Sequence, residues 1–141
     1  MRITAISDIH GDLIHIEPTD LLFIVGDWSP LDYQTKASLM QWWIKDSLIP
    51  WFKNLPAKKI VFIAGNHDFI CDPNFLYFPL GMDYPQIDFN KDILMPLLRK
   101  EGLTNKVKYL CNSSTKVSGL KIYGCPYVEG CRGWAFSQAE I

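Results

Sequence analysis

The sequence predicts an α/β fold, in which a mainly parallel sheet is flanked by helices. Three observations predict it: short apolar runs typical of buried strands, an amphipathic segment between two of these runs, and a polar motif directly after each of three runs. Strand, helix and strand in this order indicate a parallel sheet, whose ligand sites lie beyond the carboxyl ends of its strands. With 141 residues, of which 48% are hydrophobic, we expect residues 1–141 to form one domain.

The first half of the chain contains three strand candidates and one long helix candidate. Residues 3–7 and 20–25 are apolar and β-branched, as expected for strands buried on both faces. Residues 34–54 place apolar side chains at mainly helical spacing, which predicts an amphipathic helix. Pro50 lacks an N–H, so we expect a kink or a break there, and two helical pieces fit as well as one. Residues 59–64 form the third strand candidate.

The second half begins with a long loop and ends with short strands. Residues 71–88 are rich in proline, glycine and aromatic residues, which predicts an ordered loop near the mouth of a site. Residues 92–100 resemble a helix, with Gly102 placed to act as its C-cap. The remaining strand candidates, the last two joined by a Ser118-Gly119 turn, are residues 107–110, 115–117 and 120–123.

Composition argues against several classes of partner. The net charge of -1 and the pI near 6.3 give no reason to expect a long nucleic acid or a membrane surface, since both require clustered Lys and Arg. No secretion signal is visible, and no apolar run reaches the 18 or so residues that a membrane helix needs. The four cysteines have no C-x-x-C spacing, so we expect reduced thiols and a cytoplasmic protein with a small substrate.

The polar motifs after the strands contain residue types that bind divalent metals. Asp8 and His10 flank a single residue and can chelate one cation, and Asp27 has two oxygens that can bridge two cations. Asn66 offers a neutral carbonyl oxygen, and the adjacent His67 can face a substrate. Mixed oxygen and imidazole ligands suit Mn, Fe, Co or Zn.

Each motif alone also has a purely structural interpretation. Asp8 could cap a turn, Asp27 could accept hydrogen bonds from backbone amides, and the Gly-Asn pair could form a turn that leaves His67 on the surface. The occurrence of all three motifs in this order, each after an apolar run, favours metal chemistry.

These residues resemble a known family. Ser7-Asp8-Ile9-His10-Gly11-Asp12, Val25-Gly26-Asp27 and Ala64-Gly65-Asn66-His67-Asp68 resemble the first three signature blocks of the calcineurin-like metallophosphoesterases. The later Leu120-Lys121-Ile122-Tyr123-Gly124-Cys125-Pro126 and Trp134-Ala135-Phe136 resemble the metallophosphoesterase-domain branch, whose characterised members are phosphodiesterases acting on cyclic nucleotides and related esters. The resemblance implies a layered sandwich of mixed β-sheets flanked by helices.

The resemblance also implies roles for the motif residues. Asp8 and His10 would bind a first metal ion, Asp27 would bridge two ions, and Asn66 would bind the second ion while orienting the phosphate. His67 would be the catalytic acid or charge stabiliser at the phosphoryl oxygen or leaving group. The implied cofactor is a pair of divalent ions, and the implied activity is hydrolysis of a small phosphate ester by activated water.

The resemblance assigns no definite role to two carboxylates and one histidine. Asp32 or Asp68 either orients His67 or lies exposed in a turn. His15 precedes the second motif, and we expect it on the surface.

The sequence departs from the family pattern after His67. The family continues with a lone metal-binding His and a Gly-His-x-His block, whereas this chain has only His10, His15 and His67. We therefore expect the N-terminal portion of the family domain without its C-terminal part, binding two metal ions weakly, one, or none. The alternative function is a catalytically impaired or non-enzymatic interaction protein, and an incomplete core could drive self-association.

Overall fold

A four-stranded parallel sheet forms the centre of the protein in the computed structural model, which describes residues 1–74 and 87–138. The strands β1 (Ile3–Ile6), β2 (Thr19–Val25), β3 (Ala57–Ile63) and β4 (Val107–Tyr109) pair in the order β1-β2-β3-β4. Every pairing is parallel, so all four carboxyl ends lie at one edge of the sheet. The first three strand predictions are thereby confirmed, together with the position of the polar motifs at that edge.

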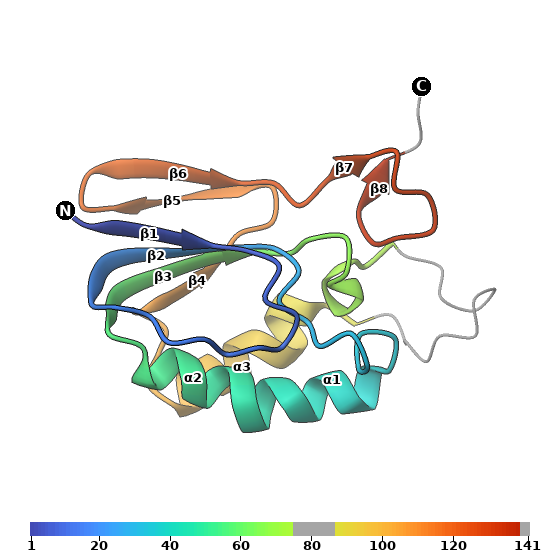
Figure 1. Ribbon diagram of the computed structural model, residues 1–141, viewed down its shortest axis with the longest axis horizontal. Helices are drawn as coiled ribbons and strands as arrows, with labels where there is room; N and C mark the ends of the chain where they lie inside the picture. The colour runs from blue at the N-terminus through green and yellow to red at the C-terminus, as the bar shows by residue number, and fades with distance from the viewer. Residues whose placement is uncertain (75–86, 139–141) are drawn as a thin grey trace.

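Two helical segments cover one face of this sheet (Figure 1). The first runs without interruption through α1 (Ala37–Trp43), the π-helical turn η1 (Ile44–Leu48) and α2 (Ile49–Asn54). Pro50 lies directly after the π turn, in which the Ile49 N–H bonds to the carbonyl of Ile44. The wider turn leaves room for a proline ring that would otherwise clash with the preceding turn. Pro50 is therefore accommodated without a break.

The second helical segment joins the π-helical η4 (Phe89–Leu94) to α3 (Met95–Lys100). The Asp88 side chain caps its start by accepting a hydrogen bond from the Lys91 N–H. At its end Gly102 has φ +68°, and the Leu103 N–H bonds to the Leu98 carbonyl at 2.8 Å. This is a Schellman ending, so the predicted C-cap at Gly102 is confirmed, and the helix begins three residues before the predicted 92–100.

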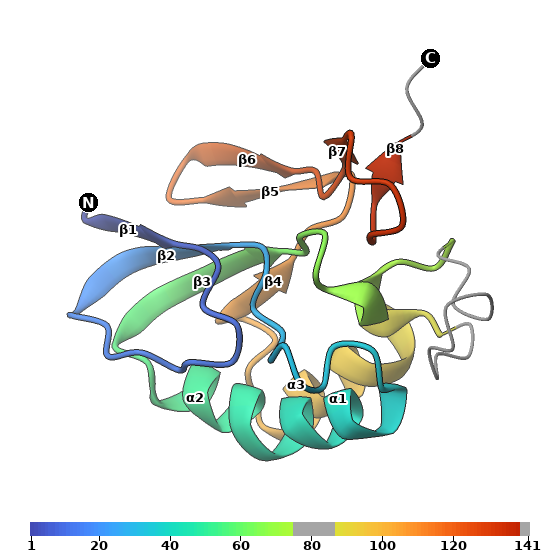
Figure 2. The same cartoon turned by 45° about the vertical axis from the view of Figure 1, so that its right-hand side comes forward.

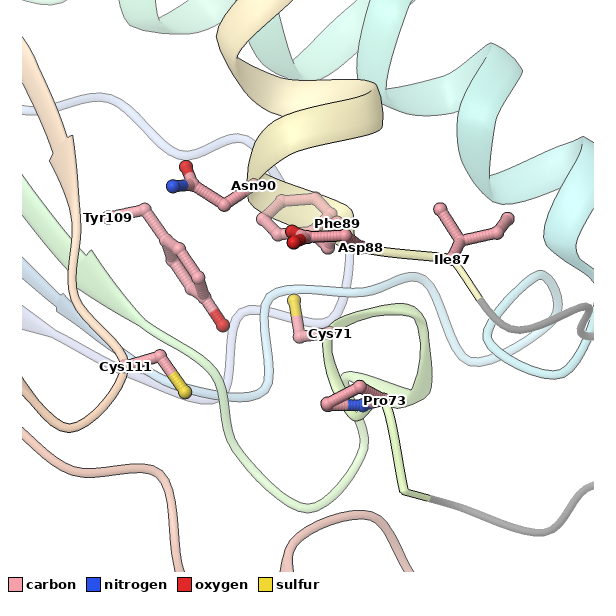
Figure 3. Close-up of a pocket in the computed structure, with 8 residues that line it drawn as sticks. All are labelled: Cys71, Pro73, Ile87, Asp88, Phe89, Asn90, Tyr109 and Cys111. Carbon is pink, nitrogen blue, oxygen red and sulfur yellow. The ribbon is translucent and has the colours of Figure 1, made fainter.

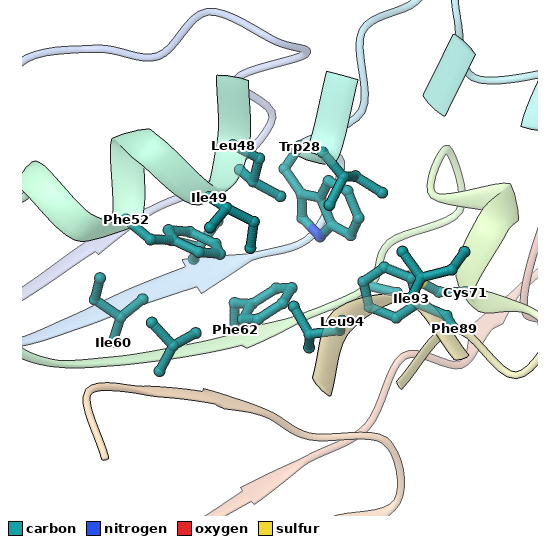
Figure 4. Packing of buried hydrophobic residues seen from close by; sticks show 14 of the residues in the cluster. Trp28, Leu48, Ile49, Phe52, Ile60, Phe62, Cys71, Phe89, Ile93 and Leu94 are labelled. Atoms are coloured by element: carbon teal, nitrogen blue, oxygen red, sulfur yellow. The ribbon is translucent and has the colours of Figure 1, made fainter. Parts of the chain in front are cut away.

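The core lies between these helices and the sheet (Figure 4). Trp28 is its centre: the indole is 1% exposed and packs against Phe62 and Phe89, each with a ring centroid 5.8 Å away. The Trp28 Nε1–H donates a hydrogen bond to the Ile63 carbonyl, which satisfies the one polar group of the buried ring. This tryptophan directly follows Asp27, so the core fixes the loop that carries the second motif.

A β-hairpin lies over the opposite face of the sheet (Figures 1 and 2). Its strands β5 (Ser113–Val117) and β6 (Leu120–Gly124) are antiparallel and joined by Ser118 and Gly119, both with positive φ. The predicted turn is thus confirmed, and β5 begins two residues earlier than expected. A side chain at Gly124 would overlap Leu110 and Ile63, so this glycine allows the hairpin to approach the sheet closely.

The expected α/β architecture is confirmed, with some differences in detail. The central sheet is wholly parallel, and antiparallel pairing within residues 1–74 and 87–138 is confined to the hairpin. A short 3-10 helix η2 (Phe69–Cys71) and the two-residue strands β7 (Val128–Glu129) and β8 (Ser137–Gln138) were not predicted. Most of the loop predicted over 71–88 lies outside the described residues. No helix of the described part is long and apolar enough to cross a membrane.

The close approach at Gly124 gives a test of the hairpin's position. We expect Gly124→Ala to lower the free energy of unfolding by about 1–3 kcal/mol, because the added methyl group overlaps the Leu110 and Ile63 side chains. Urea denaturation measures this change. Ser114→Ala on the exposed face of the partner strand β5 is the control and should change stability little. Equal stability of both variants and the wild type would show that the hairpin does not pack here.

Candidate metal centre

The loops after β1 and β2 run side by side and are paired through their backbones. The Asp8 N–H bonds to the Gly26 carbonyl at 3.1 Å, and the His10 N–H bonds to the Asp27 carbonyl at 3.0 Å. Asp8, His10 and Asp27 all have positive φ, between 44° and 57°, which is uncommon for residues other than glycine. Strained backbone conformations of this kind persist where the surroundings enforce them, and they cluster at functional sites.

The loops after β2 and β3 approach so closely that glycine is required at the contact. A Cβ at Gly26 would lie 2.9 Å from the Gly65 Cα, and a Cβ at Gly65 would overlap the Asp27 carboxylate. With no side chain on either glycine, the His67 N–H reaches Asp27 Oδ1 at 2.9 Å. The second and third motifs therefore form one unit, with the Asp27 carboxylate held against the backbone of the third.

Hydrogen bonds to the Asp68 carboxylate hold this unit together. The carboxyl group is fully buried; Oδ2 accepts hydrogen bonds from the N–H groups of Asp27 and Gly65, each at 2.7 Å. Oδ1 accepts from the Ser29 N–H at 3.0 Å and the Ser29 hydroxyl at 2.6 Å. Burial raises the pKa of the Asp68 carboxyl from 3.8 to about 6, although the hydrogen bonds from Ser29 and Gly65 oppose the shift. Asp68 is neither exposed nor a partner of His67, so both interpretations of this residue were wrong.

His10, Asp27 and His67 form the candidate metal site. One ligand atom from each lies within 4.8 Å of the others, and all three residues are half-buried. Two imidazole nitrogens and a carboxylate oxygen are a donor set that divalent transition metals accept, so the residues fit the metal chemistry that the sequence predicts. The three come from three different loops, and it is the parallel order of β1, β2 and β3 that brings them together.

The other two predicted ligands, Asp8 and Asn66, are not members of this group. Asp8 is exposed, and its carboxylate is not in the group formed by His10, Asp27 and His67. Asn66 is half-buried in the third loop, where its backbone carbonyl accepts a hydrogen bond from the Ala135 N–H at 3.1 Å. His15 is exposed and pairs with Glu17 at 3.1 Å, as expected for a surface histidine.

The His67 ring is held by residues that the motifs do not include. Its Nδ1 lies 2.9 Å from Gln34 Oε1, so Gln34 occupies the place that the sequence assigned to Asp32 or Asp68. The ring lies edge-on to His10, with centroids 4.9 Å apart, and also contacts the Trp134 ring, with centroids 4.4 Å apart. Sequence reasoning missed Gln34 because a single polar residue before a helix gives no signal of its own. The resemblance had pointed to Trp134, but without a role.

A separate cavity of about 280 Å³ lies beside η2 and η4 (Figure 3). Its walls include Cys71, Tyr109 and Cys111, and burial raises the pKa of both the Cys71 thiol and the Tyr109 hydroxyl. Burial likewise raises the pKa of the Cys111 thiol, so all three groups remain protonated at neutral pH. The cavity shares no lining residue with the candidate metal centre.

The role of Asp68 can be tested through stability. We expect Asp68→Asn to lower the free energy of unfolding by about 1–3 kcal/mol. Each carboxylate oxygen of Asp68 accepts two hydrogen bonds, and in the variant an NH₂ group, which cannot accept, replaces one of these oxygens and faces its two donors. The folded carboxyl binds its proton more tightly than the unfolded one, so the wild type's advantage should fall as pH rises from about 3.8 to about 6. Urea denaturation across this range measures both effects, with the exposed Asp46→Asn as control. A pH-independent difference would contradict the raised pKa.

Comparisons with known proteins place this chain in a family. The family model of the calcineurin-like phosphoesterases matches residues 1–126. Metallophosphoesterase domain-containing protein 1 of Homo sapiens is 28% identical over 145 residues, which cover 96% of this chain, and the Mus musculus protein of the same name gives the same values. The chain spans 40% of the length of these relatives. The match over residues 1–126 includes every motif of the site, and the chain belongs to the calcineurin-like phosphoesterase family.

Proposed function

We propose that this protein is a metal-dependent phosphoesterase that hydrolyses a small phosphate ester, in the phosphodiesterase manner that the sequence resemblance implies. The observation that carries the proposal is the group formed by His10, Asp27 and His67 at the carboxyl edge of the parallel sheet. Family membership supports metal-dependent phosphoester chemistry in general.

His10 and Asp27 are the proposed primary ligands of the metal. Asp27 is suited to this role because the His67 N–H fixes its Oδ1 atom, so little side-chain freedom is lost on binding. Asp8 and Asn66 would complete a site for two ions of Mn, Fe, Co or Zn, and a site without them would hold one. A divalent ion in such a site supplies Lewis-acid stabilisation of phosphate oxygens and activates a water molecule for attack.

His67 is the proposed catalytic residue. Its ring is half-buried beside Asp27, and one of its nitrogens lies within 4.8 Å of the donor atoms of His10 and Asp27. A phosphate bound to a metal ion held by His10 and Asp27 would lie within reach of the His67 ring nitrogen. Imidazole can release a proton near neutral pH, so His67 would protonate the leaving-group oxygen or stabilise the developing charge.

The alternative is a protein that keeps the fold without the chemistry. The absence of histidines after His67 favours this alternative, as does the exposed position of Asp8 outside the group of His10, Asp27 and His67. Metal content separates the two functions. Stoichiometric metal after purification supports the enzyme, and a protein that binds no divalent ion at millimolar concentration supports the alternative.

Charge and cysteine chemistry support a small substrate and a reducing compartment. The net charge of -1 gives no electrostatic reason to expect a long nucleic acid as the substrate. All four cysteines are free thiols, which supports the proposal of a cytoplasmic protein.

Self-association is the proposed partner interaction. Ile3 is 46% exposed on the edge strand β1, Val25 is 48% exposed at the end of β2, and Leu120 is 40% exposed at the hairpin turn. The hairpin thus leaves part of the outer sheet face open to solvent. Pairing two such faces would remove apolar area from water.

Metal dependence is the first test of this function. We expect hydrolysis of bis(p-nitrophenyl) phosphate with Mn²⁺ and its loss on chelation. Asp27→Asn should lower the Mn²⁺ affinity, measured by calorimetry, by about 100-fold. Loss of a residue that only orients a metal ligand costs up to this much, so loss of a ligand should cost at least as much. The amide oxygen of the variant can still accept the His67 N–H, so the loop should keep its conformation. His10→Gln should weaken binding similarly, and the matched control His15→Gln should not. No turnover with any divalent metal would refute the proposed activity.

Sedimentation velocity tests the proposed self-association. We expect the average mass to rise with protein concentration and Ile3→Lys to shift the protein toward monomer, because the charge would be buried in the contact. Trp42→Lys is the matched control, since Trp42 is 52% exposed on α1 over the opposite face of the sheet. A purely monomeric wild type at all concentrations would contradict the proposal.

A further inference from the structure

The His67 ring makes a single side-chain hydrogen bond among those that the described residues show. Its Nδ1 atom lies 2.9 Å from Oε1 of Gln34, and the interaction is partly buried. The Gln34 backbone is itself fixed, because its N–H bonds to the Pro30 carbonyl at 2.9 Å in the turn that leads into α1. The glutamine therefore reaches the ring from a hydrogen-bonded turn, and the contact joins two segments 33 residues apart in sequence.

We propose that Gln34 is a positioning residue that holds His67 in the tautomer with the proton on Nδ1, leaving Nε2 as the ring atom that faces the site. An amide oxygen has lone pairs and no proton, so it can only accept a hydrogen bond. With the amide oxygen turned toward the ring, as in this structure, Nδ1 carries the hydrogen, and in a neutral ring the other nitrogen carries a lone pair.

His10 follows the same arrangement with a different acceptor. Its Nδ1 lies 3.4 Å from the backbone carbonyl of Ser29, which also can only accept. Both histidines of the site thus turn Nδ1 toward a neutral oxygen and leave Nε2 available. The second ring nitrogen of a histidine at a metal site commonly has such an acceptor, which fixes the ring's orientation and tautomer.

The remaining contacts of the His67 ring fix its plane but not its proton. His10 meets it at 82° with centroids 4.9 Å apart, and Trp134 meets it at 49° with centroids 4.4 Å apart. Ring packing of this kind does not distinguish Nδ1–H from Nε2–H. Gln34 alone among these three neighbours selects between the tautomers, and because its amide is neutral it does so without adding charge beside Asp27.

This inference rests on the proposed function for its catalytic consequence and on the structure alone for the tautomer. With Nε2 facing the site, a protonated His67 would donate its Nε2 proton to the leaving-group oxygen. Its Nδ1–H group would remain hydrogen-bonded to Gln34 Oε1. Without the amide, the proton of the neutral ring is free to occupy Nε2 and the ring is free to turn. We therefore expect loss of Gln34 to reduce turnover rather than substrate binding.

The test compares Gln34→Leu, Gln34→Glu and the matched control Gln41→Leu, whose glutamine is exposed on α1. Ring ¹⁵N shifts of the metal-free proteins are recorded at about pH 8, above the ordinary histidine pKa near 6.5. The spectra contain only three histidines, so His15→Gln and His10→Gln assign them. We expect the Nδ1–H tautomer of His67 in the wild type, the Gln34→Glu variant and the control, and a tautomer mixture in Gln34→Leu.

Kinetics with Mn²⁺ and bis(p-nitrophenyl) phosphate give the second measurement. Gln34→Leu should lower kcat by about 10- to 100-fold with little change in KM, and Gln34→Glu should recover part of the loss. An Nε2–H tautomer in the wild type, or an unchanged tautomer in Gln34→Leu, would overturn the proposal. If the wild type is inactive but the tautomer changes as expected, the proposed function fails and the role of Gln34 in fixing the ring stands.

Discussion

The buried Asp68 carboxylate connects the fold of this protein to its site. It accepts hydrogen bonds from the backbone of Gly65 in the third loop and of Asp27 and Ser29 in the second, and so holds together two loops that follow neighbouring parallel strands. Its burial is costly, as the raised pKa shows, and the four donors are what make it tolerable. Asp27 is thereby held in the candidate metal site, and His67 immediately precedes Asp68 in the chain.

Much of the fold follows from local sequence patterns because the strands of the parallel sheet are short and apolar, and β2 and β3 are largely buried. The cap at Gly102 and the turn at Ser118-Gly119 could also be predicted, since each needs a positive φ that few residues adopt readily. The behaviour of Pro50 could not, because whether a proline breaks a helix depends on a π turn that tertiary packing stabilises. The pairing of β7 with β8 has no local signal, since each strand is two residues long.

The candidate site could likewise be predicted only in part. His10, Asp27 and His67 were predictable because motifs after parallel strands must meet at one edge. The surroundings of these residues were not: the burial of Asp68 depends on the approach of two loops, and the contact of Gln34 with His67 depends on where a turn places one amide. Sequence motifs thus identified the groups that gather at the candidate site, while the groups that surround and orient them are visible only in three dimensions.

The central claim is that three loops of the parallel sheet form one divalent metal site. Anomalous diffraction from a crystal grown with Mn²⁺ tests it most directly. The account predicts an anomalous peak at about 2.0–2.3 Å from an Asp27 carboxylate oxygen and from Nε2 of His10, beside the His67 ring. A peak bound elsewhere, or none at saturating Mn²⁺ with the three side chains ordered as described, would contradict it.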